Sequence, residues 1–293
     1  MNETKVTKIN YIKRAVILGI IASFFYSIMS LLVKLVSNES TESMTVFFRF
    51  SVSMFWVILV LIYKKLRNKP FTLKTKHLRL HVLRAVSAFV AMFTLYYALR
   101  YVPLADASSL SMTYTLFIPI FSFIFFGTKT SAKSWLALIT GFIGIVLILK
   151  PFNSNFNPMI LMALISSVAI ALSFLGIYEL AKHDEPYTIM FYFFPLTVIL
   201  SGIAMIFSWK TPDLSTLTTL LMIGITGTIY QDLIMRAMSY APTKIIAPLL
   251  YFGIIFSGVF DWLFWHHIPG LYFWAGASLI IGGCVFSIRY SKD

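Results

Sequence analysis

The chain has 293 residues, of which 59% are hydrophobic and only 12% are charged. Soluble globular domains are about half apolar and about a quarter charged, so this composition excludes an ordinary soluble domain and predicts an integral membrane protein. The formal net charge of +13 would suggest nucleic acid in a soluble chain. Here the basic residues lie mainly in alternate loops, and no nucleic-acid partner is expected.

Apolar segments follow one another along the whole chain, and each is about long enough to cross a hydrocarbon core roughly 30 Å thick. The connections between them are short. The sequence therefore predicts an all-α integral membrane fold with ten transmembrane helices. In chain order the expected spans are residues 15–36, 44–63, 83–100, 104–126, 133–149, 158–180, 187–208, 215–238, 245–265 and 270–288.

Lysine and arginine gather in every second connection between these segments. With the N-terminus in the cytoplasm, the outer face receives only Arg100, Lys150 and Lys210, and its first loop carries Glu39 and Glu42. An excess of Lys and Arg in short loops marks the cytoplasmic side of a membrane protein. The sequence therefore predicts that both termini are cytoplasmic.

The two halves of the chain are related by a repeat with a constant offset of 139 positions. Because the repeat unit holds five spans, an odd number, its second copy enters the membrane from the opposite side. Two inverted five-helix repeats are predicted, residues 1–150 and 151–293, an arrangement typical of secondary transporters with a substrate site between the repeats. Matched positions include Tyr101 with Tyr240, Pro103 with Pro242, and Trp135 with Trp274.

Proline occurs within three of the predicted spans. Pro119, Pro195 and Pro248 lie in the fourth, seventh and ninth segments, where each removes a helix hydrogen bond and frees a carbonyl. Such a carbonyl is tolerated in lipid only when a neighbour or a cavity satisfies it. Two interpretations stay open, a static kink or a segment that moves during function.

Some basic side chains fall inside spans, where a charge is costly and usually faces a cavity or a partner. Arg49 lies in an aromatic run, and its planar fork suits a carboxylate or a phosphate, so it is the first candidate for substrate binding. Lys34, late in the first span, is a second candidate, with snorkelling to the interface as the alternative. Arg84, at the start of the third span, is expected to snorkel.

Acidic side chains are few in the spans. Asp232 and Arg236 are four residues apart in the eighth span, which places them on one helix face in the favourable order, and they are predicted to pair. The pair either lowers the cost of insertion or belongs to a substrate site. Asp261 is expected to be solvated near the outer interface, and Asp106 to cap the start of the fourth helix.

Several tyrosines within the spans are candidates for the wall of a substrate cavity, because a buried tyrosine hydroxyl needs a hydrogen-bond partner. Their rings suit stacking on an adenine or contact with a sulfonium. The candidates are Tyr26, Tyr97, Tyr114, Tyr230 and Tyr251.

Three stretches carry a resemblance to a known family: Ala98-Leu99-Arg100-Tyr101-Val102-Pro103-Leu104-Ala105-Asp106-Ala107-Ser108, the segment around Pro119, and residues 141–151. On these stretches the chain resembles the ten-span drug/metabolite transporter superfamily of EamA type over nearly its whole length. Lys34, the Phe47-Phe48-Arg49-Phe50 run and Leu83-Arg84 are similar, within it, to S-adenosylmethionine uptake transporters. The chain departs from the superfamily where it has Gly127-Thr128-Lys129 and Trp265-His266-His267 in place of a glutamate.

We therefore expect a secondary transporter that moves a small polar metabolite across a bacterial cytoplasmic (inner) membrane by alternating access. The resemblance implies S-adenosylmethionine uptake or exchange, and an exporter of amphipathic or aromatic compounds is the alternative. A membrane enzyme is disfavoured because the sequence offers no convergent catalytic set. No catalytic residue, cofactor or metal is expected. The expected partners are a small-molecule substrate and the lipid bilayer, with a homodimer left open.

Overall fold

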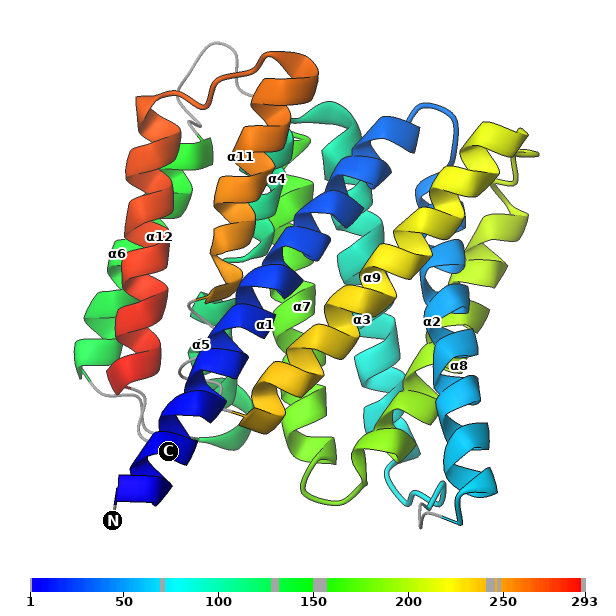
Figure 1. Ribbon diagram of the computed structural model, residues 1–293. Helices are drawn as coiled ribbons and strands as arrows, with labels where there is room; N and C mark the ends of the chain where they lie inside the picture. Colours follow the sequence, from blue (N-terminus) through cyan, green and yellow to red (C-terminus); the bar gives the residue numbers. More distant parts are fainter. Residues whose placement is uncertain are drawn as a thin grey trace.

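The computed structural model describes residues 2–68, 72–127, 132–149, 157–240, 246 and 249–290, and its elements are helices (Figure 1). Seven helical segments are long and apolar enough to span a membrane, and three shorter apolar helices complete the predicted ten. The helices are α1 (Asn2–Val36), α2 (Glu42–Leu66), α3 (Leu78–Tyr101), α4 (Leu104–Ser111), α5 (Tyr114–Phe126), α6 (Ala132–Leu149), α7 (Ile160–Leu180), α8 (Pro186–Ile206), α9 (Leu214–Tyr240), α11 (Phe252–Trp265) and α12 (Leu271–Tyr290).

The packing of these helices has an internal two-fold pattern. Helix α1 packs on α9 as α7 packs on α3, and α1 packs on α11 as α7 packs on α4 and α5. Helix α2 pairs with α8, and α6 pairs with α12. Each contact therefore has a counterpart in the other half, which confirms the two inverted five-helix repeats. The predicted boundary at residue 150 lies outside the described residues and stays a prediction.

The connections gather at two ends of the molecule in Figure 1. The upper end holds the α1–α2, α8–α9 and α11–α12 connections, and the lower end holds the N-terminus and the α2–α3 and α7–α8 connections. At the upper end, Arg100 donates from Nε to the carbonyl of Ser37 and from Nη2 to that of Ser40, both at 2.7 Å. These bonds attach the end of α3 to the connection between α1 and α2.

The fourth span is broken, but not at its proline. Helix α4 ends at Ser111 and α5 begins at Tyr114, while Pro119 lies inside α5. The Thr113 hydroxyl donates to the carbonyl of Leu110 at 2.6 Å, so a side chain satisfies a carbonyl near the break. Pro119 therefore does not mark the break, and the two interpretations of this proline, a static kink or a moving segment, stay predictions.

The ninth span is interrupted at the equivalent position. Residues 249 and 250 are helical, Tyr251 forms a turn, and α11 begins at Phe252. Tyr251 follows Met112, in the break of the fourth span, by the repeat offset of 139 positions. Pro248 lies outside the described residues. Discontinuous helices at corresponding positions of two repeats are typical of a binding site in the middle of a membrane protein.

Candidate functional site

The two interrupted spans meet at the centre of the helix bundle. A Cβ built on Gly253 would lie 2.6 Å from the Met112 methyl carbon, so the ninth span approaches the break of the fourth span closely at this glycine. The Tyr251 hydroxyl lies 2.7 Å from Oγ1 of Thr115, just beyond the other break. The Ser27 hydroxyl of α1 donates to the Gly253 carbonyl at 2.9 Å. Helix α1 therefore supplies hydrogen bonds to the backbone of the ninth span near its break.

Tyr26 connects this crossing to the eighth span. Its hydroxyl lies 3.0 Å from Oγ of Ser111, the last residue of α4. Its ring centroid lies 5.4 Å from that of Tyr230 on α9. Tyr26 is 7% exposed, so one buried ring joins α1, α4 and α9.

Arg49 on α2 adds a buried positive charge beside these rings. The side chain is 5% exposed, and Nε lies 3.4 Å from the sulfur of Met29, which is a weak acceptor. A Cβ on Gly227 of α9 would lie 3.3 Å from Nε, so glycine lets the α9 backbone approach closely. Among the described residues, no carboxylate oxygen lies within 4.0 Å of the guanidinium. A buried charge without a partner is costly, and an anion at this position would lower that cost.

Tyr96 of α3 was missed by the sequence analysis. It is 1% exposed, and its hydroxyl lies 3.9 Å from the same Met29 sulfur. The helical spacing of Ala85, Ala88 and Ala91 marks the buried face of α3, and this signal could have selected Tyr96. We define the Arg49 cluster as Tyr26, Met29, Arg49, Tyr96 and Tyr230.

The structure places the remaining candidate tyrosines outside the Arg49 cluster. Tyr97 is half-buried, and its ring centroid lies 5.1 Å from that of Tyr101. Tyr114 stacks on Phe174 of α7, with centroids 5.0 Å apart. Tyr251 is buried at the break described above. Of the predicted binding residues, Tyr26, Arg49 and Tyr230 are thus brought together.

Lys34 belongs to a second polar group, near the upper end. Its Nζ donates to the Val102 carbonyl at 2.6 Å and lies 3.7 Å from Oδ1 of Asp261. It also lies 4.8 Å from the centroid of the Trp265 ring. Lys34 therefore joins α1 to α11 and to the end of α3, and it does not extend to the interface alone.

Asp261 has the role that was expected of Asp106. It is fully buried and accepts the backbone N–H groups of Leu104 at 3.0 Å and Ala105 at 2.7 Å. A carboxylate at a helix N-terminus is stabilised by the free N–H groups and the helix dipole. The expectation of a solvated Asp261 was wrong, because this residue of α11 caps α4. Asp106 lies in the first turn of α4, and its predicted capping role stays a prediction. We call Lys34, Asp261 and the start of α4 the Lys34–Asp261 clamp.

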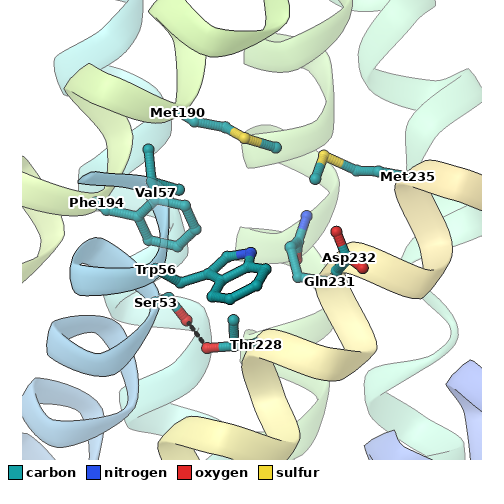
Figure 2. A pocket seen from close by; sticks show the side chains of 9 residues that line it. All are labelled: Ser53, Trp56, Val57, Met190, Phe194, Thr228, Gln231, Asp232 and Met235. Carbon is teal, nitrogen blue, oxygen red and sulfur yellow. Dashed lines mark hydrogen bonds between the residues drawn. The ribbon is translucent and has the colours of Figure 1, made fainter. Parts of the chain in front are cut away.

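Asp232 and Arg236 form the predicted ion pair, with Nε to Oδ2 at 2.7 Å. Their side chains are 29% and 63% exposed. Asp232 also lines a small cavity of about 20 Å³ between α2, α8 and α9 (Figure 2). The Ser53 hydroxyl in its wall donates to the Arg49 carbonyl at 3.2 Å, so the cavity lies about one helical turn from Arg49, toward the lower end. The lining residues are Ser53, Trp56, Val57, Met190, Phe194, Thr228, Gln231, Asp232 and Met235.

Arg84 does not snorkel. It is 5% exposed, and its guanidinium carbon lies 4.1 Å from the centroid of the Phe193 ring on α8. Gly176 of α7 faces its Cβ, and this close packing of α7 on α3 covers the side chain. The expected interfacial position was wrong because the arginine points to a neighbouring helix.

No cluster of three or more His, Cys, Asp or Glu side chains suited to a metal ion occurs in the part of the chain that the structure describes. The side chain of Cys284 lies outside that part.

Comparison with known proteins identifies the family. The EamA-like transporter family matches residues 13–150 and 157–289. The chain is 29% identical to a pseudopaline exporter of Pseudomonas aeruginosa, over 97% of this chain and 99% of the relative. It is 27% identical to an S-adenosylmethionine uptake transporter of Rickettsia bellii, over 84% and 83%, and 27% identical to a riboflavin transporter of Vibrio cholerae, over 80% and 79%.

A solved crystal structure has the same fold, with a TM-score of 0.65 and 17% identity over 93% of this chain and 96% of the other. The family match covers both repeats and nearly the whole chain, in agreement with the ten-helix architecture. The chain belongs to the EamA-like transporter family and is a multi-pass membrane protein with a role in transport.

Proposed function

We propose that the protein is a secondary transporter of a small polar metabolite, and that Arg49 binds an anionic group of this substrate. The observation that carries the proposal is the burial of Arg49 without a carboxylate within 4.0 Å among the described residues. The guanidinium presents a rigid fork of donors that matches a carboxylate in two-point contact. A carboxylate on the substrate would supply the missing negative charge.

The rest of the Arg49 cluster suits an aromatic or cationic part of the same substrate. Tyr26, Tyr96 and Tyr230 offer ring faces next to the arginine, and Met29 offers a polarisable thioether. Aromatic faces bind both planar rings and onium ions. S-Adenosylmethionine combines a carboxylate, an adenine ring and a sulfonium, and it is the first substrate to test. The similarity to relatives named for its uptake supports this choice.

Alternating access is supported by the arrangement around the cluster. Interrupted helices from both repeats cross beside Tyr26, and the Lys34–Asp261 clamp joins α1, α4 and α11 at the upper end. The cavity lined by Asp232 lies on the lower side of Arg49. We propose that the upper end faces the outside of a bacterial cytoplasmic membrane and that both termini are cytoplasmic. In this orientation the outer side is closed by the clamp.

Export is the second candidate function. It is supported by the similarity to the pseudopaline exporter, which covers 97% of this chain. Both candidates use the same Arg49 cluster and differ in the direction of net movement. Neither requires a catalytic residue, a cofactor or a metal ion.

The test is transport by the purified protein in proteoliposomes. We expect uptake of S-adenosylmethionine and none of its decarboxylated analogue, which lacks the group that Arg49 would bind. Riboflavin and amino acids in the same panel test the other substrate classes, and outward movement from loaded vesicles tests export.

Arg49→Lys is the decisive variant because it keeps the charge and loses the fork. Hydrogen bonds to charged groups contribute about 1.5–3 kcal/mol, so we expect the apparent affinity to fall by about 10-fold to 150-fold. Arg79→Lys, on an exposed position of α3, is the matched control and should transport normally. An unchanged affinity in Arg49→Lys would exclude two-point recognition.

A further inference from the structure

A second group of unpartnered polar atoms lies at the interface of α3 and α8, nearer the lower end. Among the described residues, the buried side-chain nitrogens without a hydrogen-bond partner are Nε of Arg84 and Nδ1 of His81. The two residues are three positions apart on α3, so their side chains lie on one face of the helix. Unpartnered buried nitrogens are rare in native proteins, and each calls for an explanation.

Both side chains point to the same helix. Nη1 of Arg84 donates to the Ile189 carbonyl at 3.4 Å, a long bond, and the guanidinium carbon lies over the Phe193 ring at 4.1 Å. The His81 ring centroid lies 4.8 Å from that of Tyr192. Ile189, Tyr192 and Phe193 share one face of α8. The two unpartnered nitrogens therefore lie at a single helix–helix interface, about one helical turn apart.

The charges around Arg84 leave it without a carboxylate partner. Among the described residues, none has a carboxylate oxygen within 4.0 Å of its guanidinium. The nearby acid, Asp184, is occupied: its Oδ2 accepts the Thr75 hydroxyl at 2.7 Å and lies 2.8 Å from Nε2 of His81. An arginine that is 95% buried without a counter-charge is costly, and a bound anion would remove that cost.

We propose that Arg84 and His81 form a second anion-binding site, which takes a carboxylate or a phosphate group. The guanidinium provides the charge and the unused Nε–H. His81 can donate from Nδ1 when its ring is protonated, while Nε2–H remains bonded to Asp184. A role of this site in transport rests on the proposed function. Its ability to bind an anion is inferred from the geometry of α3 and α8 alone.

The two arginines are connected through a pair of phenylalanines. The guanidinium carbon of Arg49 lies 4.4 Å from the Phe50 ring centroid, and that of Arg84 lies 4.1 Å from the Phe193 ring centroid. The two rings contact each other edge to face at 5.6 Å. Arg49 lies two turns from the upper end of α2, and Arg84 lies fewer than two turns from the lower end of α3. An anionic substrate leaving Arg49 toward the lower end would reach Arg84 once the Phe50–Phe193 contact opens.

The direct test is anion binding by the purified full-length protein in nanodiscs. Thermal unfolding is followed by tryptophan fluorescence during titration with sodium acetate or sodium phosphate, against sodium chloride at equal ionic strength. The Arg49→Gln background removes the first arginine. We expect a saturable rise in the unfolding midpoint in this background with at least one of the two anions. A response to acetate assigns the site to carboxylate groups, and a response to phosphate assigns it to phosphate groups.

Three further variants in the Arg49→Gln background decide the proposal. Arg84→Gln should raise the apparent dissociation constant for the anion at least tenfold. Arg84→Lys, which loses the planar fork of donors, should raise it several-fold. Arg79→Gln, on the same helix but exposed, should bind normally. No saturable response in the background, or unchanged binding in Arg84→Gln, would overturn the site. If Arg84→Gln does not elute as a folded protein, unchanged binding in Arg84→Lys overturns it.

The pH dependence of anion binding tests the contribution of His81. The titratable groups around the ring are Asp184 from the loop before α8, Tyr192 from α8, Arg84 from α3, and His77, which directly precedes α3. Because the proposed donor at Nδ1 exists only in the protonated ring, we expect tighter anion binding at pH 6 than at pH 8. His81→Gln should remove this difference, and a difference that persists would exclude the histidine from the site.

The proposal of a second anion site and the proposed function can fail independently. If Arg49→Lys transports normally while Arg84 still binds anions, the proposal for Arg49 fails and the second site stands. If transport depends on Arg49 and Arg84→Gln binds anions normally, the second site fails and the proposed function stands.

Discussion

Replacing Asp261 by asparagine should open the upper end of the protein. In the closed clamp, the carboxylate accepts two backbone N–H groups of α4 and lies 3.7 Å from Nζ of Lys34. Asparagine keeps one oxygen acceptor and presents an amide NH₂ in place of the other. One N–H of α4 then loses its partner, and Lys34 loses its counter-charge while keeping the Val102 carbonyl.

The size of the effect follows from these losses. An unpaired buried donor costs about 1–3 kcal/mol, and breaking a buried ion pair costs about 3–5 kcal/mol. Lys34 retains a strong hydrogen bond and is 13% exposed, so we expect a total of about 2–4 kcal/mol. In an outward-open form these groups would be hydrated and the substitution would cost little. The equilibrium should therefore shift by about 30-fold to 1,000-fold toward the open form.

Cysteine accessibility measures this shift. Cys284 is replaced by serine, and Ser108→Cys places a thiol below the clamp at a position that is 1% exposed. We expect an impermeant thiol reagent to label this cysteine in whole cells much faster when Asp261→Asn is present. Asp213→Asn is the matched control, because Asp213 accepts the Thr216 N–H at 2.8 Å as an exposed cap of α9 without an ion pair.

Unchanged labelling of Ser108→Cys, together with a lower unfolding temperature in Asp261→Asn, would refute the reasoning. The clamp would then stabilise the fold without controlling access. Faster labelling only in inside-out vesicles would refute the orientation instead.

Three other predictions concern orientation, coupling and pH. With both termini inside, Asn38→Cys should react with an impermeant reagent in whole cells and Lys76→Cys should not; both positions are exposed, and the reverse pattern would exclude this topology. Because Asp232 is paired with Arg236 at 2.7 Å, we expect preloaded substrate to stimulate exchange and an imposed pH gradient to leave transport unchanged. Substrate accumulation that is driven by the gradient and lost in Asp232→Asn would make Asp232 the coupling residue. Burial raises the pKa of Asp184, but hydrogen bonds from Thr75 and His81 outweigh it, and the pKa of the carboxyl is lowered. The ionised carboxyl therefore stabilises the fold above the unfolded-state pKa, about 3.9, and this contribution is lost as the pH falls through the folded-state pKa. Asp184→Asn should lose less stability than the wild type between pH 5 and pH 3, and an equal loss would contradict this.

The sequence by itself determined the membrane class, the spans and the repeat. Apolar length and the constant offset between halves are properties of the linear chain, and the bilayer requires each span to satisfy its own backbone as a helix. The same reasoning selected Arg49, because a charge inside a span is costly wherever the span packs. It also placed Asp232 next to Arg236, because residues four apart on one helix meet without help from any other helix.

Only the tertiary structure decided which polar groups meet between helices. Asp261 caps α4 from α11, and Arg84 lies on Phe193 of α8, although neither partner is near in sequence. Tyr96 belongs to the Arg49 cluster while the adjacent Tyr97 contacts Tyr101, because the packing of α3 on α7 and α8 fixes the rotation of the helix. The partners that a polar side chain in a span can reach depend on which helices pack together, and no single helix specifies this packing.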